Sequence, residues 1–309
     1  MTAATVGRLP DVRSPFPSRL NPYTGEAERR ALRWARRVGL ITSAEVVALA
    51  GQRFGRLTGR CHPGFGLTRL ADVCRWYLWF AVLDDRYCDR SERPGELSQR
   101  LAVISRVLDD PGTVTSDPVA VAAADLVRRT RLRATHEQYR RLVLGFQATF
   151  FGLLWEHAAR GPETDPSAHE YLGMRPYTGA LPAFATLTEI YGGRPPSPQD
   201  VARPEVAALV ARVGNLIMWQ NDIRSYPAEL ASGKPVLSLP TVLEQERGLA
   251  PESALELAAT MWRDEVDAYR RARAAVLALG VPALWRHANH LHDLLVGFLT
   301  WHYETARYH

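Results

Sequence analysis

Cysteine is scarce in this sequence, and the few copies present show no pairing pattern. Three occur in 309 residues, at Cys61, Cys74 and Cys88, without a CxxC motif. An odd, sparse set argues against a scaffold held by disulfides and is typical of a reducing compartment. We therefore expect a cytoplasmic protein whose fold depends on a hydrophobic core.

Long apolar runs are also absent. The longest apolar stretch spans the 14 residues 142–155 and is broken by Gln147 and Thr149. This length is too short for a typical membrane span, so we expect a buried core helix and no membrane insertion. Residues 1–24 are rich in proline and lack the apolar centre of a signal peptide, which predicts an extended N-terminal arm.

Sustained alternation of apolar and polar residues, the pattern of β-strands, does not occur. From residue 26 onward, apolar residues recur at spacings of three and four, which predicts helices with short breaks at glycine and proline. The expected helices span residues 26–38, 43–54, 67–90, 96–108, 117–134, 136–160, 166–191, 198–229, 234–246, 251–279 and 282–306. Neither a repeat nor a linker divides them, so we expect an all-α protein with one helical domain over residues 25–309.

The charge balance is moderately basic, with a net charge of +5 and a pI of about 9.3. Arginines concentrate between residues 128 and 141, within a helical pattern and without a nucleic-acid recognition motif. We interpret them as a solvated helix face and expect no nucleic-acid partner. A small anionic substrate would also suit a basic protein.

Carboxylates gather at the end of a strongly apolar predicted helix. The aromatic and aliphatic run from Trp76 to Leu83 is followed by Asp84, Asp85 and Asp89. Negative charge near a helix C-terminus is disfavoured by the helix dipole, so carboxylates placed there usually need a cation. Asp85 and Asp89 are one turn apart and share a face, with Asp84 beside them. Oxygen ligands suit Mg²⁺; a solvent-exposed helix end is the alternative.

A second set of oxygen-bearing side chains follows the apolar run at residues 216–219. Asn221, Ser225 and Glu229 are spaced four residues apart, so they form one stripe of a helix, about 80° wide. Their amide, hydroxyl and carboxylate oxygens make a second candidate site for a hard metal; polar surface is the alternative. Two such helix ends in one chain favour the metal interpretation.

At these residues the sequence resembles the bacterial class I terpene cyclases. The DDxxxD segment at residues 84–89 is similar to their aspartate-rich motif, and NDxxSxxxE at residues 221–229 to their Asn/Ser/Glu metal triad. The resemblance extends to Arg175, 46 residues before the triad, and to the pair Arg307-Tyr308, 78 residues after it. It therefore spans most of the chain.

The resemblance implies a fold, an activity and a cofactor. The fold would be a class I terpenoid synthase bundle around a central apolar cavity, and the enzyme would ionise and cyclise a linear isoprenyl diphosphate. Three Mg²⁺ ions would be bound, two by the aspartates of the first motif and one by the triad. Arg175, Arg307 and Tyr308 would clamp the diphosphate.

The segment around Arg175 would hold an induced-fit element, with Arg175 as the diphosphate sensor, Thr178 as the linker and Gly179 as the effector. Gly179 and Pro182 are both unfavourable in a helix interior, so the helix expected here should bend. A bend would free backbone carbonyls toward the cavity. A simple loop is the alternative.

The chain departs from the family pattern in two places. Three residues separate Asp85 from Asp89, one more than in the usual motif, so Asp84 is the firmer candidate ligand. Many relatives carry Lys or Arg immediately before the triad glutamate, where this chain has Ala228. Arg224 lies one helical turn earlier, and we hypothesise that it supplies the missing cation to the diphosphate.

Aromatic side chains would line the cavity and stabilise the carbocation, each by roughly 0.5–2 kcal/mol. Bound diphosphate or the Gly179 region would accept the final proton. The candidate cavity residues are Trp79, Phe80, Phe150, Phe151, Trp219 and Trp301.

Motifs do not fix the length of the isoprenyl chain. The long aspartate spacing with Cys88 is similar to that of some bacterial diterpene cyclases, which slightly favours geranylgeranyl diphosphate over farnesyl diphosphate. A prenyltransferase-like protein, which would need a second aspartate-rich motif at residues 221–229, and a non-enzymatic helical scaffold are remote alternatives. Relatives are often antiparallel dimers, so a homodimer is a candidate assembly.

Overall fold

The computed structural model describes residues 9–88, 94–161, 164–231 and 236–308. These residues contain helices and no strand, which confirms the expected all-α fold. The elements are α1 (Thr24–Arg37), α2 (Glu45–Gly51), α3 (Phe54–Cys61), α4 (Leu67–Leu83), the π-helical turn η1 (Asp84–Cys88), α5 (Pro94–Asp109), α6 (Pro118–Arg131), α7 (His136–Ala159), α8 (Ala168–Thr178), α9 (Leu181–Gly192), α10 (Pro198–Val201), α11 (Pro204–Ala231), α12 (Leu239–Arg247), α13 (Pro251–Ala278), α14 (Pro282–Trp301) and the 3₁₀ turn η2 (Ala306–Tyr308). Within the described part of the chain, every helix is too short or too polar to cross a membrane.

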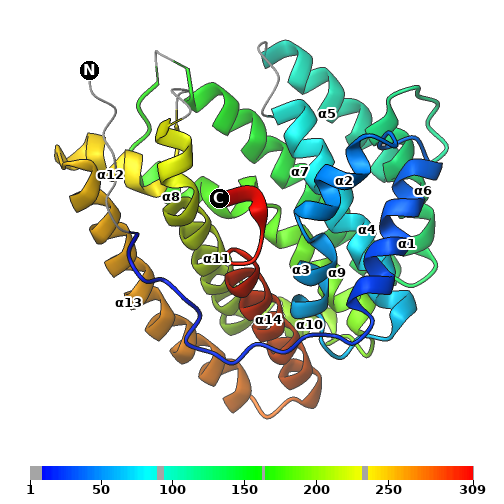
Figure 1. Ribbon diagram of the computed structural model, residues 1–309. Helices are drawn as coiled ribbons and strands as arrows, with labels where there is room; N and C mark the ends of the chain where they lie inside the picture. The colour runs from blue at the N-terminus through cyan, green and yellow to red at the C-terminus, as the bar shows by residue number, and fades with distance from the viewer. Residues whose placement is uncertain (1–8, 89–93, 162–163, 232–235, 309) are drawn as a thin grey trace.

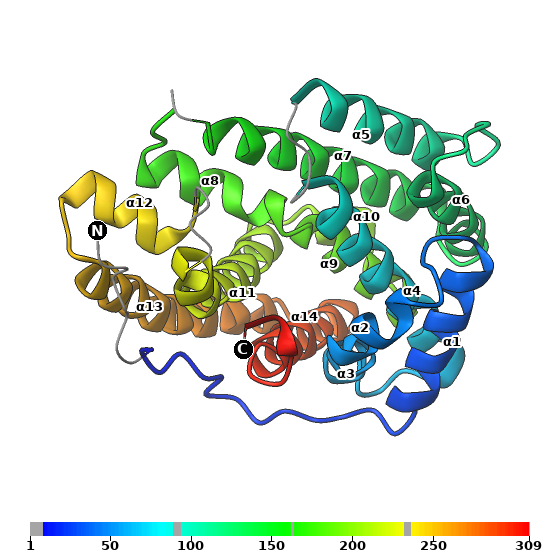
Figure 2. The ribbon, with the colours of Figure 1, turned by 45° about the horizontal axis from the view of Figure 1, so that its top comes forward.

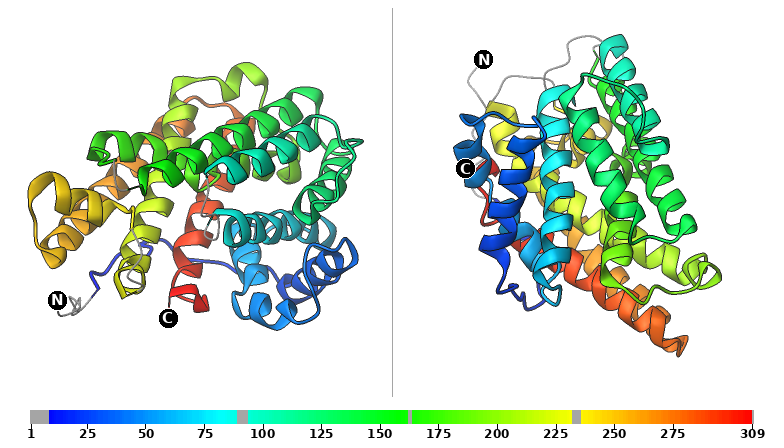
Figure 3. Two further views of the ribbon diagram at one scale, coloured as in Figure 1. Left: turned by 90° about the horizontal axis from the view of Figure 1, so that it is seen from above. Right: turned by 90° about the vertical axis from the view of Figure 1, so that its right-hand side faces the viewer.

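The long helices pack as a bundle around a core drawn from both halves of the chain. Helix α11 packs against α13 and α14, α7 packs against α8 and α9, and α14 contacts α3. Figures 1 and 2 show α11 and α14 in the middle, with α5 and α7 on one side and α13 on another. Many of the long helices run roughly along one direction in the right-hand view of Figure 3, so their ends gather at the same side of the bundle.

Residues 9–23 form an extended segment along the outside of the bundle, drawn in blue in Figures 1 and 2. Val12 is fully buried, and its carbonyl accepts a hydrogen bond of 2.6 Å from Gln220 of α11. The ring of Phe16 packs edge-on against Tyr269 of α13, with 5.6 Å between the ring centroids. Asn21 donates hydrogen bonds to backbone carbonyls in the loop after α3. The segment thus connects helices that are far apart in the sequence.

Besides the predicted bend at Gly179, the observed helices differ from the expected ones at three breaks. The helix expected over residues 43–54 ends at Gly51 as α2, and the unexpected α3 begins at Phe54, because Arg53 takes a left-handed backbone conformation with φ of 59°. The helix expected over 198–229 starts anew at Pro204, since proline lacks the amide that a helix interior requires. The helix expected over 67–90 is α-helical only to Leu83 and continues as η1.

Candidate active site

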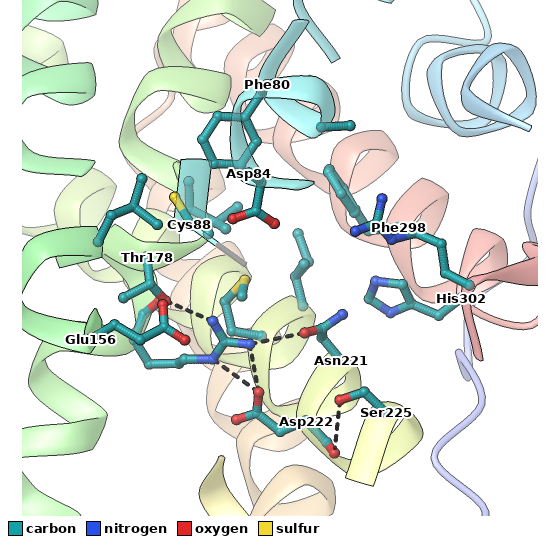
Figure 4. A pocket seen from close by; sticks show the side chains of 18 of the residues that line it. Phe80, Asp84, Cys88, Glu156, Thr178, Asn221, Asp222, Ser225, Phe298 and His302 are labelled. Atoms are coloured by element: carbon teal, nitrogen blue, oxygen red, sulfur yellow. Dashed lines mark hydrogen bonds and ion pairs between the residues drawn. The ribbon is translucent and has the colours of Figure 1, made fainter. Parts of the chain in front are cut away.

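A pocket of about 260 Å³ opens where the C-terminal ends of α4, α7, α11 and α14 converge (Figure 4). The apolar part of its lining consists of Phe54, Leu57, Tyr77, Phe80, Ala81, Leu153, Leu181, Phe184, Ile217, Met218, Leu237, Phe298 and Trp301. The polar part includes several of the motif residues. Because each helix dipole places partial negative charge at the C-terminus, four converging C-terminal ends favour a cation here.

The π-helical turn η1 carries the first two aspartates. Asp84 lines the pocket, whereas Asp85 accepts hydrogen bonds from Arg307 at 2.7 and 3.5 Å. π-helical turns of this kind are frequent at functional sites. The third aspartate, Asp89, lies outside the described residues, so its role as a metal ligand stays a prediction.

Asn221, Ser225 and Glu229 all line the pocket from α11, as their spacing predicts. Figure 4 shows Asn221 and Ser225 across the pocket from Asp84. Burial raises the pKa of the Glu229 carboxyl, and this effect is opposed by a hydrogen bond from Ser225 and by nearby arginines, including Arg160. A cation bound beside this carboxyl would favour its ionised form.

Arg175 is joined to the triad by hydrogen bonds. Its guanidinium donates to Asp222 Oδ1 at 2.6 and 2.9 Å, to Asn221 Oδ1 at 2.9 Å and to Thr178 Oγ1 at 2.6 Å. Burial alone would lower the pKa of Arg175, but the Asp222 carboxylate raises that pKa well above its ordinary value. Asp222 also accepts from the Tyr171 hydroxyl at 2.6 Å. A ligand that moves the Arg175 guanidinium would therefore also disturb its hydrogen bond to Asn221.

The expected bend occurs at Gly179 and is confirmed. Helix α8 ends at Thr178 and α9 begins at Leu181, with Ala180 in the left-handed region at φ of 56°. A Cβ atom at Gly179 would overlap the side chain of Met218, which also lines the pocket. Thr178 and Gly179 line the pocket as well, and their roles as linker and effector stay predictions.

The C-terminal arginine lies at the same pocket. Arg307 lines it and donates to Gln52 Oε1 at 2.8 Å as well as to Asp85. Tyr308 belongs to η2, but its side chain lies outside the described part of the structure. Diphosphate binding by this pair therefore stays a prediction.

Of the predicted cavity aromatics, Phe80 and Trp301 line the pocket. The prediction was wrong for Trp79, Phe150, Phe151 and Trp219. Phe151 lies on the outside of α7 with 64% of its surface exposed. The indole of Trp79 points into the core, where its N–H donates to the Val119 carbonyl at 2.9 Å.

Helical spacing explains this error on α4. Tyr77 and Phe80 precede Asp84 by seven and four residues, so all three share one helix face. Trp79 precedes Asp84 by five residues and points elsewhere. The sequence therefore contained the information needed to choose Tyr77 instead of Trp79.

Four aromatic residues of the lining were not predicted: Phe54, Tyr77, Phe184 and Phe298. Tyr77 stacks on Phe184 with 4.6 Å between ring centroids, and Phe298 meets the Tyr77 ring edge-on at 5.7 Å. Phe80 meets Phe184 edge-on at 5.5 Å. These rings come from α4, α9 and α14, and no local pattern in the sequence shows that they meet.

Arg224 does not line the pocket, which corrects its predicted role. Its guanidinium lies over the ring of Tyr303, with 4.3 Å to the centroid. Arg224 immediately precedes Ser225, so it is turned about 100° around α11 from the triad stripe. The aromatic contact with Tyr303 stabilises that direction of the side chain.

Sequence reasoning missed two polar contributions to the pocket. Helix α7 supplies Glu156, His157 and Arg160 from its C-terminal end. The segment after α14 supplies His302, whose Nδ1 lies 2.7 Å from Gln220 Oε1. Burial lowers the pKa of His302 to about 3, so this imidazole is neutral at pH 7. The α7 residues follow helical spacing, but no motif linked α7 to the site.

The donor set fits Mg²⁺ shared with a ligand. Within the described residues, no three His, Cys, Asp or Glu side chains come together as a metal cluster. Asp84 instead lies across the pocket from Asn221 and Ser225 (Figure 4). Mg²⁺ prefers oxygen ligands and commonly binds through one or two carboxylates plus substrate phosphates. Phosphate oxygens between these two sides would complete such a site.

Comparison with known proteins identifies the family. The family description "Terpene synthase family 2, C-terminal metal binding" matches residues 75–268 of the 309. The chain belongs to this terpene synthase family, and it is a terpene cyclase.

Relatives resemble the chain over nearly its full length. The 4-epi-cubebol synthase of Streptosporangium roseum, described as cyclizing (2E,6E)-farnesyl diphosphate, is 28% identical over 97% of this chain and 92% of its own. The (12E)-labda-8(17),12,14-triene synthase of Streptomyces anulatus is 29% identical over 97% and 95%. The 2-methylisoborneol synthase of Streptomyces coelicolor, solved with Mg²⁺ and 2-fluoroneryl diphosphate, is 25% identical and matches with a TM-score of 0.90 over 98% of both chains.

Proposed function

We propose that this terpene cyclase uses Mg²⁺ to ionise farnesyl diphosphate and cyclises the resulting allylic cation. The observation that carries the proposal is the pocket itself, in which Asp84 faces Asn221 and Ser225 beside an apolar cavity lined by aromatic rings. Such a site joins a place for a diphosphate to a place for a hydrocarbon chain.

The size of the cavity supports the shorter substrate. At about 260 Å³, it is smaller than most ligand pockets, which measure roughly 300–1,000 Å³. A fifteen-carbon chain fits such a space better than a twenty-carbon chain. Geranylgeranyl diphosphate remains the second candidate because three residues separate Asp85 from Asp89, a spacing similar to that of some diterpene cyclases.

In this proposal, polar side chains bind the metal and the diphosphate, and aromatic side chains surround the hydrocarbon chain. Asp84 and the Asn221/Ser225/Glu229 triad would hold Mg²⁺, which neutralises the diphosphate as its C–O bond breaks. Arg175 and Arg307 would bind diphosphate oxygens by charge-assisted hydrogen bonds. The faces of Tyr77, Phe80, Phe184 and Phe298 would stabilise the cation by roughly 0.5–2 kcal/mol each and exclude water from it.

A product assay by gas chromatography–mass spectrometry tests this proposal. The purified protein would be incubated with Mg²⁺ and separately with geranyl, farnesyl, geranylgeranyl and geranylfarnesyl diphosphates. We expect a cyclic product from farnesyl diphosphate, at least about 100-fold reduced in Asp84→Ala and Asn221→Ala because each removes a metal-binding oxygen. Arg224→Gln is the matched control, since Arg224 lies outside the pocket. A product from geranylgeranyl diphosphate alone would overturn the substrate assignment, and no product from any of them would overturn the activity.

A further inference from the structure

The C-terminal end of α7 brings an arginine to the pocket that no sequence motif indicated. Arg160 is the C-cap of α7 and lines the pocket together with Glu156 and His157. Its Nη2 donates to Glu156 Oε1 at 2.8 Å, and 35% of its side chain is exposed. A cation is favoured at this position because it faces the negative end of the helix dipole.

The charges around the pocket show why this cation matters. Among the described residues, the arginines that line the pocket are Arg160, Arg175 and Arg307. Arg175 is bonded to Asp222 inside the protein, and Arg307 to Asp85. Arg160 comes from the end of α7 and is hydrogen-bonded to Glu156 of the same helix.

The position of Arg160 also relates it to the triad side of the candidate diphosphate site. Its charge lowers the pKa of Glu229 on α11, against the effect of burial, so the two groups lie within electrostatic reach. The carboxylate of its partner Glu156 likewise raises the pKa of Arg175 on α8. Figure 4 shows Glu156 close to Thr178, on the side of the pocket opposite His302. Glu156 is thus hydrogen-bonded to Arg160 and lies within electrostatic reach of Arg175.

We propose that Arg160 is a diphosphate-binding residue, whose guanidinium turns from Glu156 to the oxygens of the substrate diphosphate when the pocket is occupied. The inference rests on the proposed function and deepens it. The planar guanidinium presents paired N–H donors that match phosphate oxygens, and the partly exposed side chain has room to turn. Glu156 is then a positioning residue that holds Arg160 at the pocket before the substrate arrives.

Isothermal titration with inorganic pyrophosphate in the presence of Mg²⁺ tests the inference directly. We expect Arg160→Gln to weaken pyrophosphate binding about tenfold and to raise the KM for the isoprenyl diphosphate by a similar factor. Arg160→Lys keeps the charge but loses the paired N–H donors, so it should weaken binding less than Arg160→Gln does. Arg224→Gln, which removes an arginine outside the pocket, should bind as the wild type does. The product pattern of Arg160→Gln should be unchanged, because no apolar lining residue is altered.

Three results would overturn the inference. The inference requires Arg160→Gln to bind pyrophosphate more weakly than Arg224→Gln, so equal binding by these two variants would contradict a role for Arg160 with the diphosphate. Equal weakening in Arg160→Gln and Arg160→Lys, together with a lowered melting temperature in both, would assign Arg160 to the stability of the α7 end instead. Failure of the wild type both to bind pyrophosphate and to turn over any substrate would refute the proposed function, and this inference with it.

Discussion

The carboxylate of Glu304 fixes the segment that leads to Arg307. It accepts hydrogen bonds from Arg56 Nη2 at 2.9 Å and from Arg60 Nε at 2.8 Å, both on α3. Burial alone would raise the pKa of Glu304, but the two guanidinium groups hold that pKa at about 2. The arginine that the resemblance assigns to the diphosphate is thus placed by an ion-pair network three residues away.

We expect Glu304→Gln to lower the stability at pH 7 by about 2 kcal/mol, because the amide loses the charge that both arginines bind. The folded-state pKa lies below the unfolded one, so the contribution is complete above about pH 4.5 and is lost as pH falls toward 2. Chemical denaturation of both proteins between pH 7 and pH 3 measures this. A stability difference that stayed constant over that range would contradict the assignment to Glu304.

Glycine allows α3 and α14 to approach each other closely. Helix α14 crosses α3 at Gly297, where an added Cβ atom would overlap the backbone and Sγ of Cys61. A Cβ atom added at Gly173 on α8 would instead meet open space. Glycine is therefore required by close packing at position 297 but not at position 173, although both residues lie within helices.

We expect Gly297→Ala to destabilise the fold by about 2 kcal/mol or more, because the helices must move apart. Gly173→Ala should instead stabilise it by roughly 0.5–1 kcal/mol, since alanine costs less backbone entropy in a helix. Thermal and urea unfolding of the two variants provide the comparison. Equal effects of both substitutions would show that the α3–α14 contact is looser than the structure has it.

At the scale of the whole molecule, residues 9–23 run along the outside of the helical bundle (Figures 1 and 2). This segment reaches the pocket indirectly, because Val12 binds Gln220 and Gln220 in turn binds His302 in the pocket lining. The Gln220 amide N–H₂ is used by the Val12 carbonyl, so its oxygen faces His302 Nδ1. The segment thereby fixes the direction of a neutral imidazole at the cavity.

We expect deletion of residues 1–20 to lower the melting temperature by about 5 °C or more, since a buried valine and an aromatic contact are lost. It should also change the ratio of products, because His302 becomes free to turn. Deletion of residues 1–8 alone is the matched control and leaves the contacts of residues 9–23 in place. Calorimetry and product analysis report the two effects separately, and an unchanged product ratio in the longer deletion would rule out the link to His302.

Local patterns in the sequence determined the helical class and the helix face that carries the triad. The spacing of Asn221, Ser225 and Glu229 placed them on one face because helical periodicity depends only on neighbouring residues, and Gly179 with Pro182 predicted the break between α8 and α9. Spacing also distinguishes Tyr77, which shares a helix face with Asp84, from Trp79, which does not.

Tertiary structure decided which helices meet and where their long side chains point. Arg160 reaches the pocket because α7 ends beside α8. Arg224 does not line the pocket, because its guanidinium packs on the ring of Tyr303. Helix α3, which begins after a left-handed residue, contributes Phe54 to the same pocket. These outcomes depend on contacts between residues distant in the chain, and helical periodicity carries no information about them.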